Sequence, residues 1–143
     1  MKQGRAFYLL NIVLPLAFGG ICYLLFRPDT YLSHMVRSVA ALPTISPSAD
    51  CAVLTFLRNF LCDMLWAYAL TVAVSRIIGQ SPARSAAVLA ICWTLEIGIE
   101  WLQKMQVLSG TFDPMDIFLE CITTIAALLL VNRHRQHTKR RPT

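Results

Sequence analysis

The stretch TLEIGIEWLQKMQ, residues 94–106, combines an apolar background with regularly spaced polar side chains. Glu96, Glu100 and Gln103 follow one another at intervals of four and three residues. These intervals place all three side chains on one face of an α-helix. The stretch therefore predicts a helix that suits hydrocarbon on most sides and carries one polar side that must be shielded from it.

The whole chain has the composition of an integral membrane protein. Of its 143 residues, 56% are hydrophobic and 15% are charged, and the mean hydropathy is +0.55. Soluble domains are nearer to about 45–50% apolar and about 25% charged. The net charge of +5 does not indicate a nucleic-acid partner, because the basic residues lie at the ends of apolar segments and in the C-terminal tail.

Four apolar segments approach the length of about 20 residues that a bilayer requires. They predict an all-α membrane protein with a four-span transmembrane helix bundle, at residues 7–26, 57–74, 86–108 and 115–131. Residues 1–131 are expected to form this single bundle. The first segment follows two basic residues, but its apolar run is longer than that of a signal peptide, so we expect a retained span.

The sequence also predicts the structure of the segments between and after the spans. Residues 27–50 contain three prolines and are expected to form an outer loop, whose middle is compatible with a short interfacial helix. Residues 132–143 are expected to be a disordered basic tail in which His134 and His137 are solvated. The five cysteines include no CxxC pair, so they indicate small buried side chains rather than disulfides or a zinc site.

Lysine and arginine predict the orientation. If the N-terminus is cytoplasmic, four spans return the C-terminus to the cytoplasm. Nine of the thirteen basic residues then lie on the cytoplasmic side, and the other four are Arg27, Arg37, Arg58 and Lys104. This distribution satisfies the positive-inside rule. We therefore predict a multi-pass protein of the bacterial inner (cytoplasmic) membrane, with both termini in the cytoplasm.

Each of the last three predicted spans carries polar side chains at helical spacing. At about 1.5 Å per residue, Asp63, Glu100 and Glu120 lie roughly 6 Å outward of the midpoints of their predicted spans. A charged residue at the centre of a span costs about 2.5–3.5 kcal/mol on insertion scales. These carboxylates should therefore face one another or a wet cavity instead of lipid.

We predict a polar ligand-binding site that opens to the outer face of the membrane. Carboxylates at close range cannot all ionise cheaply, so Glu96 or Glu100 is expected to keep its proton unless a cation compensates. Candidate charge partners are Arg58 and Lys104. The alternative is a hydrogen-bond network that only holds the helices together, and helix capping alone would account for Asp113. The predicted site residues are Asn59, Asp63, Glu96, Glu100, Gln103, Asp116 and Glu120.

The second half of the chain resembles the VanZ-like family of small bacterial integral membrane proteins. Three pieces carry the resemblance: RNFLCDMLWAYAL, EIGIEWLQ and GTFDPMDIFLE. Their matching positions are Asn59, Asp63, Trp66, Glu100, Gln103 and Asp116. The chain departs from the family where Glu120 stands in place of a frequent Asn, and it lacks a basic residue often found shortly before the aspartate. The resemblance implies a polytopic membrane protein, linked to the cell envelope and to low-level glycopeptide (teicoplanin) antibiotic resistance.

Four functions remain open. The site of a binding or accessory protein would engage membrane lipids or another polar, amphiphilic or lipid-linked ligand at the outer leaflet. A membrane enzyme acting on a lipid-linked substrate would use Glu100 as base and Asp63 with Asp116 as ligands. The chain has no recognised nucleophile or metal signature, so an enzyme is disfavoured and no catalytic residue, metal or cofactor is assigned. A proton- or cation-coupled carrier of four spans would need to form a homodimer, and a structural subunit would need no ligand.

Overall fold

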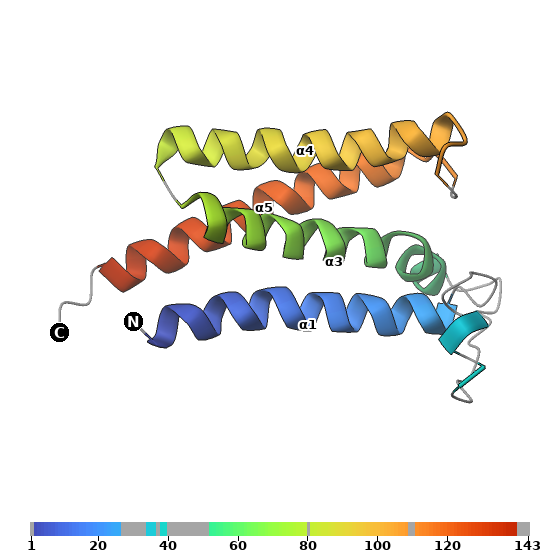
Figure 1. Cartoon of the computed structure of the whole chain (residues 1–143), viewed down its shortest axis with the longest axis horizontal. Coiled ribbons are helices and arrows are strands. Elements are labelled where there is room, and N and C mark those ends of the chain that lie inside the picture. The colour runs from blue at the N-terminus through green and yellow to red at the C-terminus, as the bar shows by residue number, and fades with distance from the viewer. Residues whose placement is uncertain are drawn as a thin grey trace.

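The protein is built from four long helices, and the described part of the chain contains no strand (Figure 1). This computed structural model describes residues 2–26, 34–36, 38–39, 52–79, 81–108 and 111–139. The helices are α1 (Lys2–Phe26), α3 (Ala52–Ile78), α4 (Pro82–Lys104) and α5 (Pro114–Lys139).

Each helix contains a segment that is long and apolar enough to cross a membrane. The segments are 20 to 24 residues long and comprise Ala6–Leu25, Asn59–Ile78, Ala83–Lys104 and Pro114–His137. The predicted all-α, four-span architecture is therefore confirmed.

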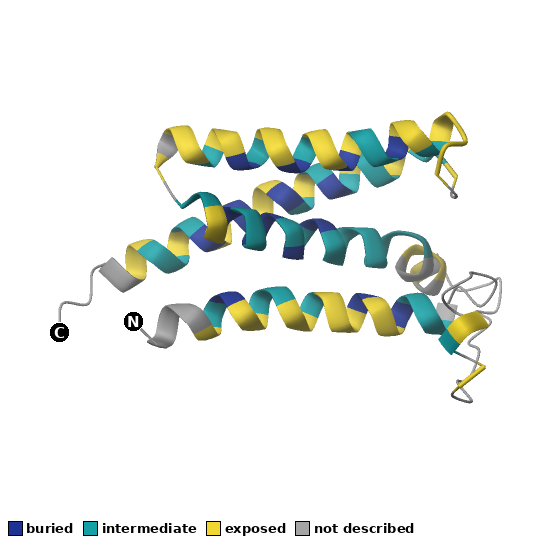
Figure 2. Cartoon of the chain, viewed as in Figure 1, coloured by how far each residue is buried: buried dark blue, intermediate teal, exposed yellow. Residues whose placement is uncertain are grey.

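Helix α3 lies at the centre of the bundle. It contacts α1 on one side and α4 and α5 on the other, and α4 also contacts α5. Residues 59–75 of α3 are all buried or half-buried, whereas α1, α4 and α5 expose large apolar side chains along their outer faces (Figure 2). Those apolar faces suit hydrocarbon, because lipid chains are as apolar as the side chains that meet them. Helix α3 is therefore the helix best shielded from lipid.

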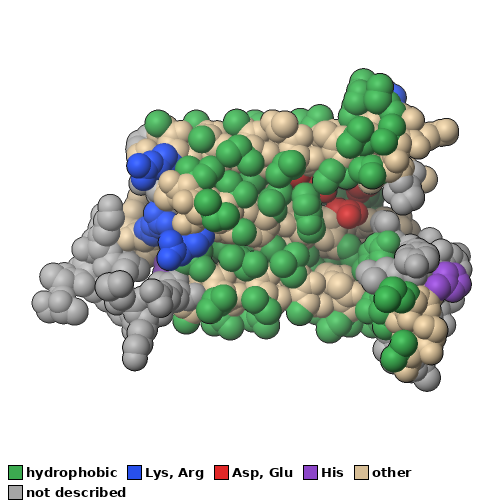
Figure 3. All heavy atoms as spheres, in the orientation of Figure 1, with side chains coloured by type: hydrophobic (Ala, Val, Ile, Leu, Met, Phe, Trp, Pro, Cys, Tyr) green, Lys and Arg blue, Asp and Glu red, His purple; other side chains and the backbone are tan. Residues whose placement is uncertain are grey.

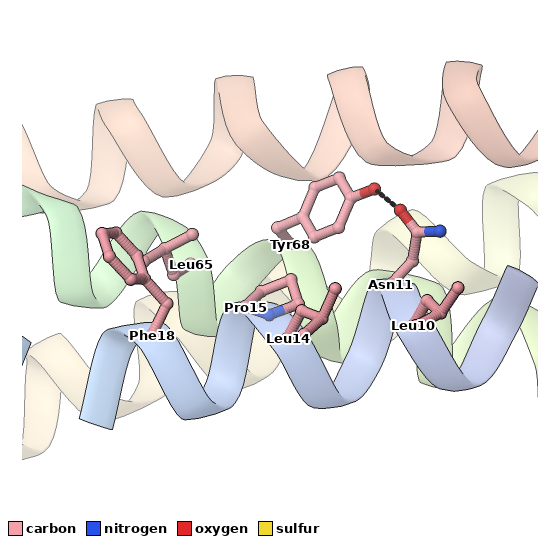
Figure 4. Close-up of a pocket in the computed structure, with 7 residues that line it drawn as sticks. All are labelled: Leu10, Asn11, Leu14, Pro15, Phe18, Leu65 and Tyr68. Atoms are coloured by element: carbon pink, nitrogen blue, oxygen red, sulfur yellow. Dashed lines mark hydrogen bonds between the residues drawn. The ribbon is translucent and has the colours of Figure 1, made fainter. Parts of the chain in front are cut away.

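Polar and close backbone contacts join α1 to α3. The Tyr68 hydroxyl donates a hydrogen bond to Asn11 Oδ1 at 2.5 Å (Figure 4). Asn11 Nδ2 donates to the Phe7 carbonyl at 2.8 Å. Further along, the Cys62 thiol donates to the Gly19 carbonyl at 3.5 Å. A Cβ added at Gly19 would lie 3.5 Å from Leu65 Cβ, so the helices approach closely where α1 has no side chain.

Helix α4 ends four residues before the predicted limit of its span. The N–H of Gln106 donates to the Gln103 carbonyl at 2.9 Å, and the N–H of Val107 donates to the Leu102 carbonyl at 2.9 Å. Gln106 has a φ of 59°, which completes a Schellman C-cap. Glycine usually holds this position. With glutamine there, the sequence carried no signal for the end of the helix.

The prediction of a disordered tail is wrong for residues 132–139, because α5 continues to Lys139. Arg135 Nε donates a hydrogen bond to the Tyr8 hydroxyl at 2.7 Å. The His134 ring stacks on Phe7, with ring centroids 3.7 Å apart and an interplanar angle of 4°. These contacts with α1 hold the last turns of α5 in a helix. Residues 140–143 lie outside the described part of the chain.

The other predicted segment boundaries differ less from the observed ones. Helix α3 begins five residues earlier and ends four residues later than its predicted span, which included only the most apolar part. The proposed interfacial helix in residues 27–50 lies largely outside the described residues, of which 34–36 are helical. The described cysteines are free thiols, namely Cys22, Cys62, Cys92 and Cys121.

The start of α1, the end of α5 and the α3–α4 connection lie at one end of the bundle, which we call the terminal end (Figure 1). The α4–α5 connection lies at the opposite end, which we call the distal end. This arrangement is the one expected of four antiparallel spans. The side of the membrane that each end faces stays a prediction from the positive-inside rule.

Two neighbouring glycines of α1 offer a test of the α1–α3 packing. The change Gly19→Leu should force Leu65 to move and lower the free energy of unfolding by about 1–3 kcal/mol, as overpacking does. The matched control is Gly20→Leu, because a Cβ at Gly20 meets nothing within 4 Å. Thermal unfolding of both variants in one detergent measures the difference. Equal stability of the two variants would show that α1 and α3 do not approach closely at Gly19.

Candidate functional site: an acidic cluster between three helices

Carboxylates from α3, α4 and α5 converge between these helices. Glu120 lies near enough to four other carboxylates to interact with them electrostatically, and the same holds for Glu100 and Asp63. We call this group the acidic cluster: Asp63, Glu96, Glu100, Asp116 and Glu120. Figure 3 shows acidic side chains at the surface towards the distal end. The predicted convergence of carboxylates from three helices is therefore present in the structure.

The five carboxylates differ in burial. Asp63 and Asp116 are half-buried. Glu100 and Glu120 are 6% and 7% exposed, and Glu96 is only 1% exposed. The cluster thus leads from the partly open distal end into the interior of the bundle.

The heights of the carboxylates follow from the observed apolar segments. Counted from the segment midpoints at about 1.5 Å per residue, Asp63 and Glu120 lie roughly 8 Å and Glu100 roughly 10 Å towards the distal end. Glu96 lies only about 4 Å from its midpoint by the same count. The three outer carboxylates share a level as predicted. They lie somewhat further from the centre, because the observed segments end differently from the predicted ones.

Glu96 belongs to a hydrogen-bond network that joins all three helices. The Thr124 hydroxyl of α5 donates to Glu96 Oε1 at 2.6 Å. The Thr71 hydroxyl of α3 has two acceptors within hydrogen-bond distance, Thr124 Oγ1 at 3.3 Å and the Ala67 carbonyl at 2.8 Å, and its single proton can go to either. All three side chains are fully or almost fully buried. We call these residues the Glu96–Thr124–Thr71 network.

Some polar atoms of the site have no protein partner. Glu96 Oε2 and Glu120 Oε2 are buried, and neither has a hydrogen-bond partner among the described residues. The same holds for the Ser75 hydroxyl, one turn of α3 beyond Thr71. A buried polar atom without a partner costs about 1–3 kcal/mol, so packing alone does not account for these atoms.

Glu100 has a structural partner. The backbone N–H of Asp113 donates to Glu100 Oε2 at 3.2 Å, and this bond ties the α4–α5 connection to α4. Asp113 Oδ1 in turn accepts from the backbone N–H of Met115 at 2.9 Å. Asp113 therefore caps the N-terminus of α5, as the sequence predicts.

The other predicted site residues lie around the cluster. Asn59 and Gln103 are half-buried. The Lys104 ammonium lies 4.9 Å from the ring centroid of Trp101 and 4.9 Å from that of Phe112. No ion pair joins Lys104 to a carboxylate in the described part of the chain, so aromatic rings are its contacts here. The side chain of Arg58 lies outside the described residues.

Sequence reasoning missed Thr71, Thr124 and Ser75 as members of the polar interior. Their spacing offered a signal. Thr124 follows Glu120 by four residues, and Thr71 follows Asp63 by eight, so each continues the polar face of its helix. Hydroxyl groups are common in apolar helices, and only the three-helix packing shows that Thr124 bonds to Glu96 and that Thr71 contacts Thr124.

Two grooves on the surface lie apart from the acidic cluster. One has a volume of about 440 Å³ and lies between α1 and α3 beside the Asn11–Tyr68 hydrogen bond (Figure 4). The other, of about 700 Å³, lies on α4 and includes Trp93, Gly98 and Trp101. Neither lining contains a carboxylate. Their mainly apolar linings suit acyl chains better than a polar ligand.

The four apolar helices define the class of a multi-pass membrane protein, here with carboxylates inside the bundle. Comparisons of the chain with protein-family models, with curated proteins and with solved structures found no match. The relation to VanZ-like proteins therefore stays a prediction. In the described part of the chain, no three His, Cys, Asp or Glu side chains are arranged to hold a metal ion.

Two adjacent threonines of α5 allow a test of the network around Glu96. The change Thr124→Val keeps the shape of the side chain but leaves Glu96 Oε1 without a donor, which should lower the free energy of unfolding by about 1–3 kcal/mol. The control is Thr123→Val, because the Thr123 hydroxyl bonds only to the Leu119 carbonyl of its own helix at 2.7 Å. Unfolding curves in one detergent compare the variants. If Thr124→Val is no less stable than Thr123→Val, the network does not exist.

Proposed function

We propose that the acidic cluster binds the cationic or polar head group of an amphiphile at the outer leaflet of the bacterial inner membrane. The observation that carries this proposal is the pair of buried carboxylate oxygens, Glu96 Oε2 and Glu120 Oε2, without a hydrogen-bond donor among the described residues. Each of these oxygens belongs to a cluster of carboxylates from three helices. A head group with N–H or O–H donors supplies what both oxygens lack.

Two buried oxygens of the cluster lack hydrogen-bond donors among the described residues. This favours a ligand-binding site over a purely structural network. A buried polar network stabilises a bundle only when all its members are satisfied, and a half-satisfied network is less favourable than an apolar interface. Glu120 adds to this cost, because it interacts with four other carboxylates. Neutralisation by a cationic ligand would remove that repulsion.

The position of the cluster favours an amphiphile over a soluble ligand. With a hydrocarbon core of about 30 Å, carboxylates about 8–10 Å from the centre lie below the head-group layer. Exposed apolar side chains lie beside them on the same helices, including Phe118 on α5 and Ile97 and Trp101 on α4. An acyl chain on this surface would bring its head group to the cluster. The resemblance to VanZ-like proteins adds a link to the cell envelope and to glycopeptide resistance.

A cationic probe tests this proposal. Dodecylamine should bind the purified protein in a nonionic detergent, and Glu120→Gln should weaken binding at least about tenfold, because a charge-assisted contact is worth about 1.5–3 kcal/mol. The matched control is Asp113→Asn, which neutralises a neighbouring carboxylate but keeps a residue that caps helices. This control should stay within about twofold of the wild-type affinity.

Titration calorimetry measures these affinities, and mass spectrometry identifies lipids and small molecules that co-purify with each variant. Equal dodecylamine binding by the wild type, Glu120→Gln and Asp63→Asn would exclude a ligand role for the cluster. Loss of binding in Asp113→Asn to the same degree would point to diffuse attraction instead of a site.

A second candidate function is a proton- or cation-coupled carrier, which the Glu96–Thr124–Thr71 network favours. The network continues the polar line of the cluster past the middle of the bundle, and the buried Ser75 hydroxyl extends this line towards the terminal end. Intramembrane carboxylates that face the bundle interior are typical of proton relays.

Flux measurements distinguish the carrier from the binding protein. Vesicles that contain the protein and a trapped pH-sensitive dye should acidify under an imposed potential faster than protein-free vesicles. Glu96→Gln should reduce the rate to that of protein-free vesicles, because it removes the central ionisable group. Thr94→Val is the control, since the exposed Thr94 hydroxyl bonds only to the Ala90 carbonyl. A wild-type rate equal to that of empty vesicles would exclude proton transport.

A further inference from the structure

The terminal end of the bundle brings two arginines to one tyrosine. Tyr8 of α1 is 8% exposed. The Cζ atoms of Arg76 on α3 and Arg135 on α5 lie 5.5 and 5.7 Å from the centroid of its ring. Arg135 Nε also donates a hydrogen bond to the Tyr8 hydroxyl at 2.7 Å. Three helices therefore meet at this residue, and two of them contribute a guanidinium group.

The two guanidinium groups have no carboxylate partner in the described part of the chain. All described acidic residues lie towards the distal end of the bundle, whereas Figure 3 shows basic side chains gathered at the terminal end. A guanidinium group has five N–H donors. Only Nε of Arg135 is bound to a described acceptor, so the remaining donors of both groups are available to an anion. An anion here would also offset the repulsion between the two cations.

The depth of these residues matches the membrane interface. Arg76 and Arg135 lie two residues before the ends of the apolar segments of α3 and α5, and Tyr8 lies two residues after the start of that of α1. At about 1.5 Å per residue, all three are roughly 3 Å inside the ends of their spans. The apolar neighbours of two of them in sequence, Leu9 and Ile77, are 62% and 83% exposed. A head group at the arginines would thus have apolar side chains beside its acyl chains.

We propose that Arg76 and Arg135 form a binding site for the phosphate of an anionic phospholipid, with Tyr8 as the residue that positions both guanidinium groups. The planar donors of guanidinium match phosphate oxygens in pairs. Basic pockets between transmembrane helices are known to bind anionic head groups. The site is independent of the acidic cluster, which lies at the other end of the bundle.

Binding of phosphatidylglycerol to the full-length protein tests the site. Native mass spectrometry from a neutral detergent at about 150 mM salt, where diffuse attraction is screened beyond roughly 8 Å, should show tighter binding of phosphatidylglycerol than of phosphatidylcholine. The double change Arg76→Gln with Arg135→Gln should weaken phosphatidylglycerol binding about 30-fold. The matched control, Arg84→Gln with Arg133→Gln, removes two exposed arginines from the same end and should change binding less than about threefold.

Three outcomes would overturn the proposal. Equal losses in the two double variants would indicate diffuse attraction, and equal affinities for the two lipids would show that the anionic charge is not recognised. Displacement of bound phosphatidylglycerol by inorganic phosphate at about 10 mM would identify a site for small anions instead of a lipid. If the double variant does not fold, the single change Arg76→Gln tests the site instead, since it preserves the hydrogen bond between Arg135 and Tyr8. It should weaken binding about fivefold, and unchanged affinity would contradict the site.

Discussion

The cost of placing a carboxylate in hydrocarbon constrains the whole bundle. Glu96 lies near the middle of an apolar segment, where an exposed charge costs several kcal/mol, and only contacts with other helices lower that cost. Its partner Thr124 is on α5, and Thr71 connects the pair to α3. The polar faces of three helices must therefore meet at one depth, and this requirement leaves their opposite faces to the lipid. The exposed apolar side chains of α4 and α5 agree with that division.

The central place of α3 follows from polar side chains that contact two different neighbouring helices. Tyr68 bonds to Asn11 of α1, whereas Thr71 faces Thr124 of α5. A helix whose polar side chains contact two neighbouring helices cannot turn those side chains to lipid without losing hydrogen bonds, because hydrocarbon offers no acceptor. Helix α1 has few polar side chains and meets only this one neighbour extensively. The other three helices form the part of the bundle that encloses the carboxylates.

Spacing along each helix allowed the spans and the convergence of carboxylates to be predicted, because both depend on local periodicity and on a fixed rise per residue. The helix ends were predicted less well. Helix α4 ends at a glutamine in the left-handed region, where the sequence offers no glycine. Helix α5 continues because His134 and Arg135 contact residues more than 120 positions earlier in the chain. Thr71 and Thr124 were missed for the same reason, since their importance depends on packing between distant segments.

All the described acidic residues of the distal end except Asp63 divide into two groups, according to whether the construction of a helix end explains them. Asp113 caps α5, and Asp116 in the first turn benefits from the positive end of the helix dipole. Glu100 accepts the backbone N–H of Asp113. Glu96 and Glu120 lie away from the ends of their helices, so capping and the helix dipole do not account for them, and each keeps a buried oxygen without a donor in the described part of the chain. Helix construction accounts for the first group, so the chemical role of the cluster must depend on the second, which lies deeper in the bundle and interacts with the rest.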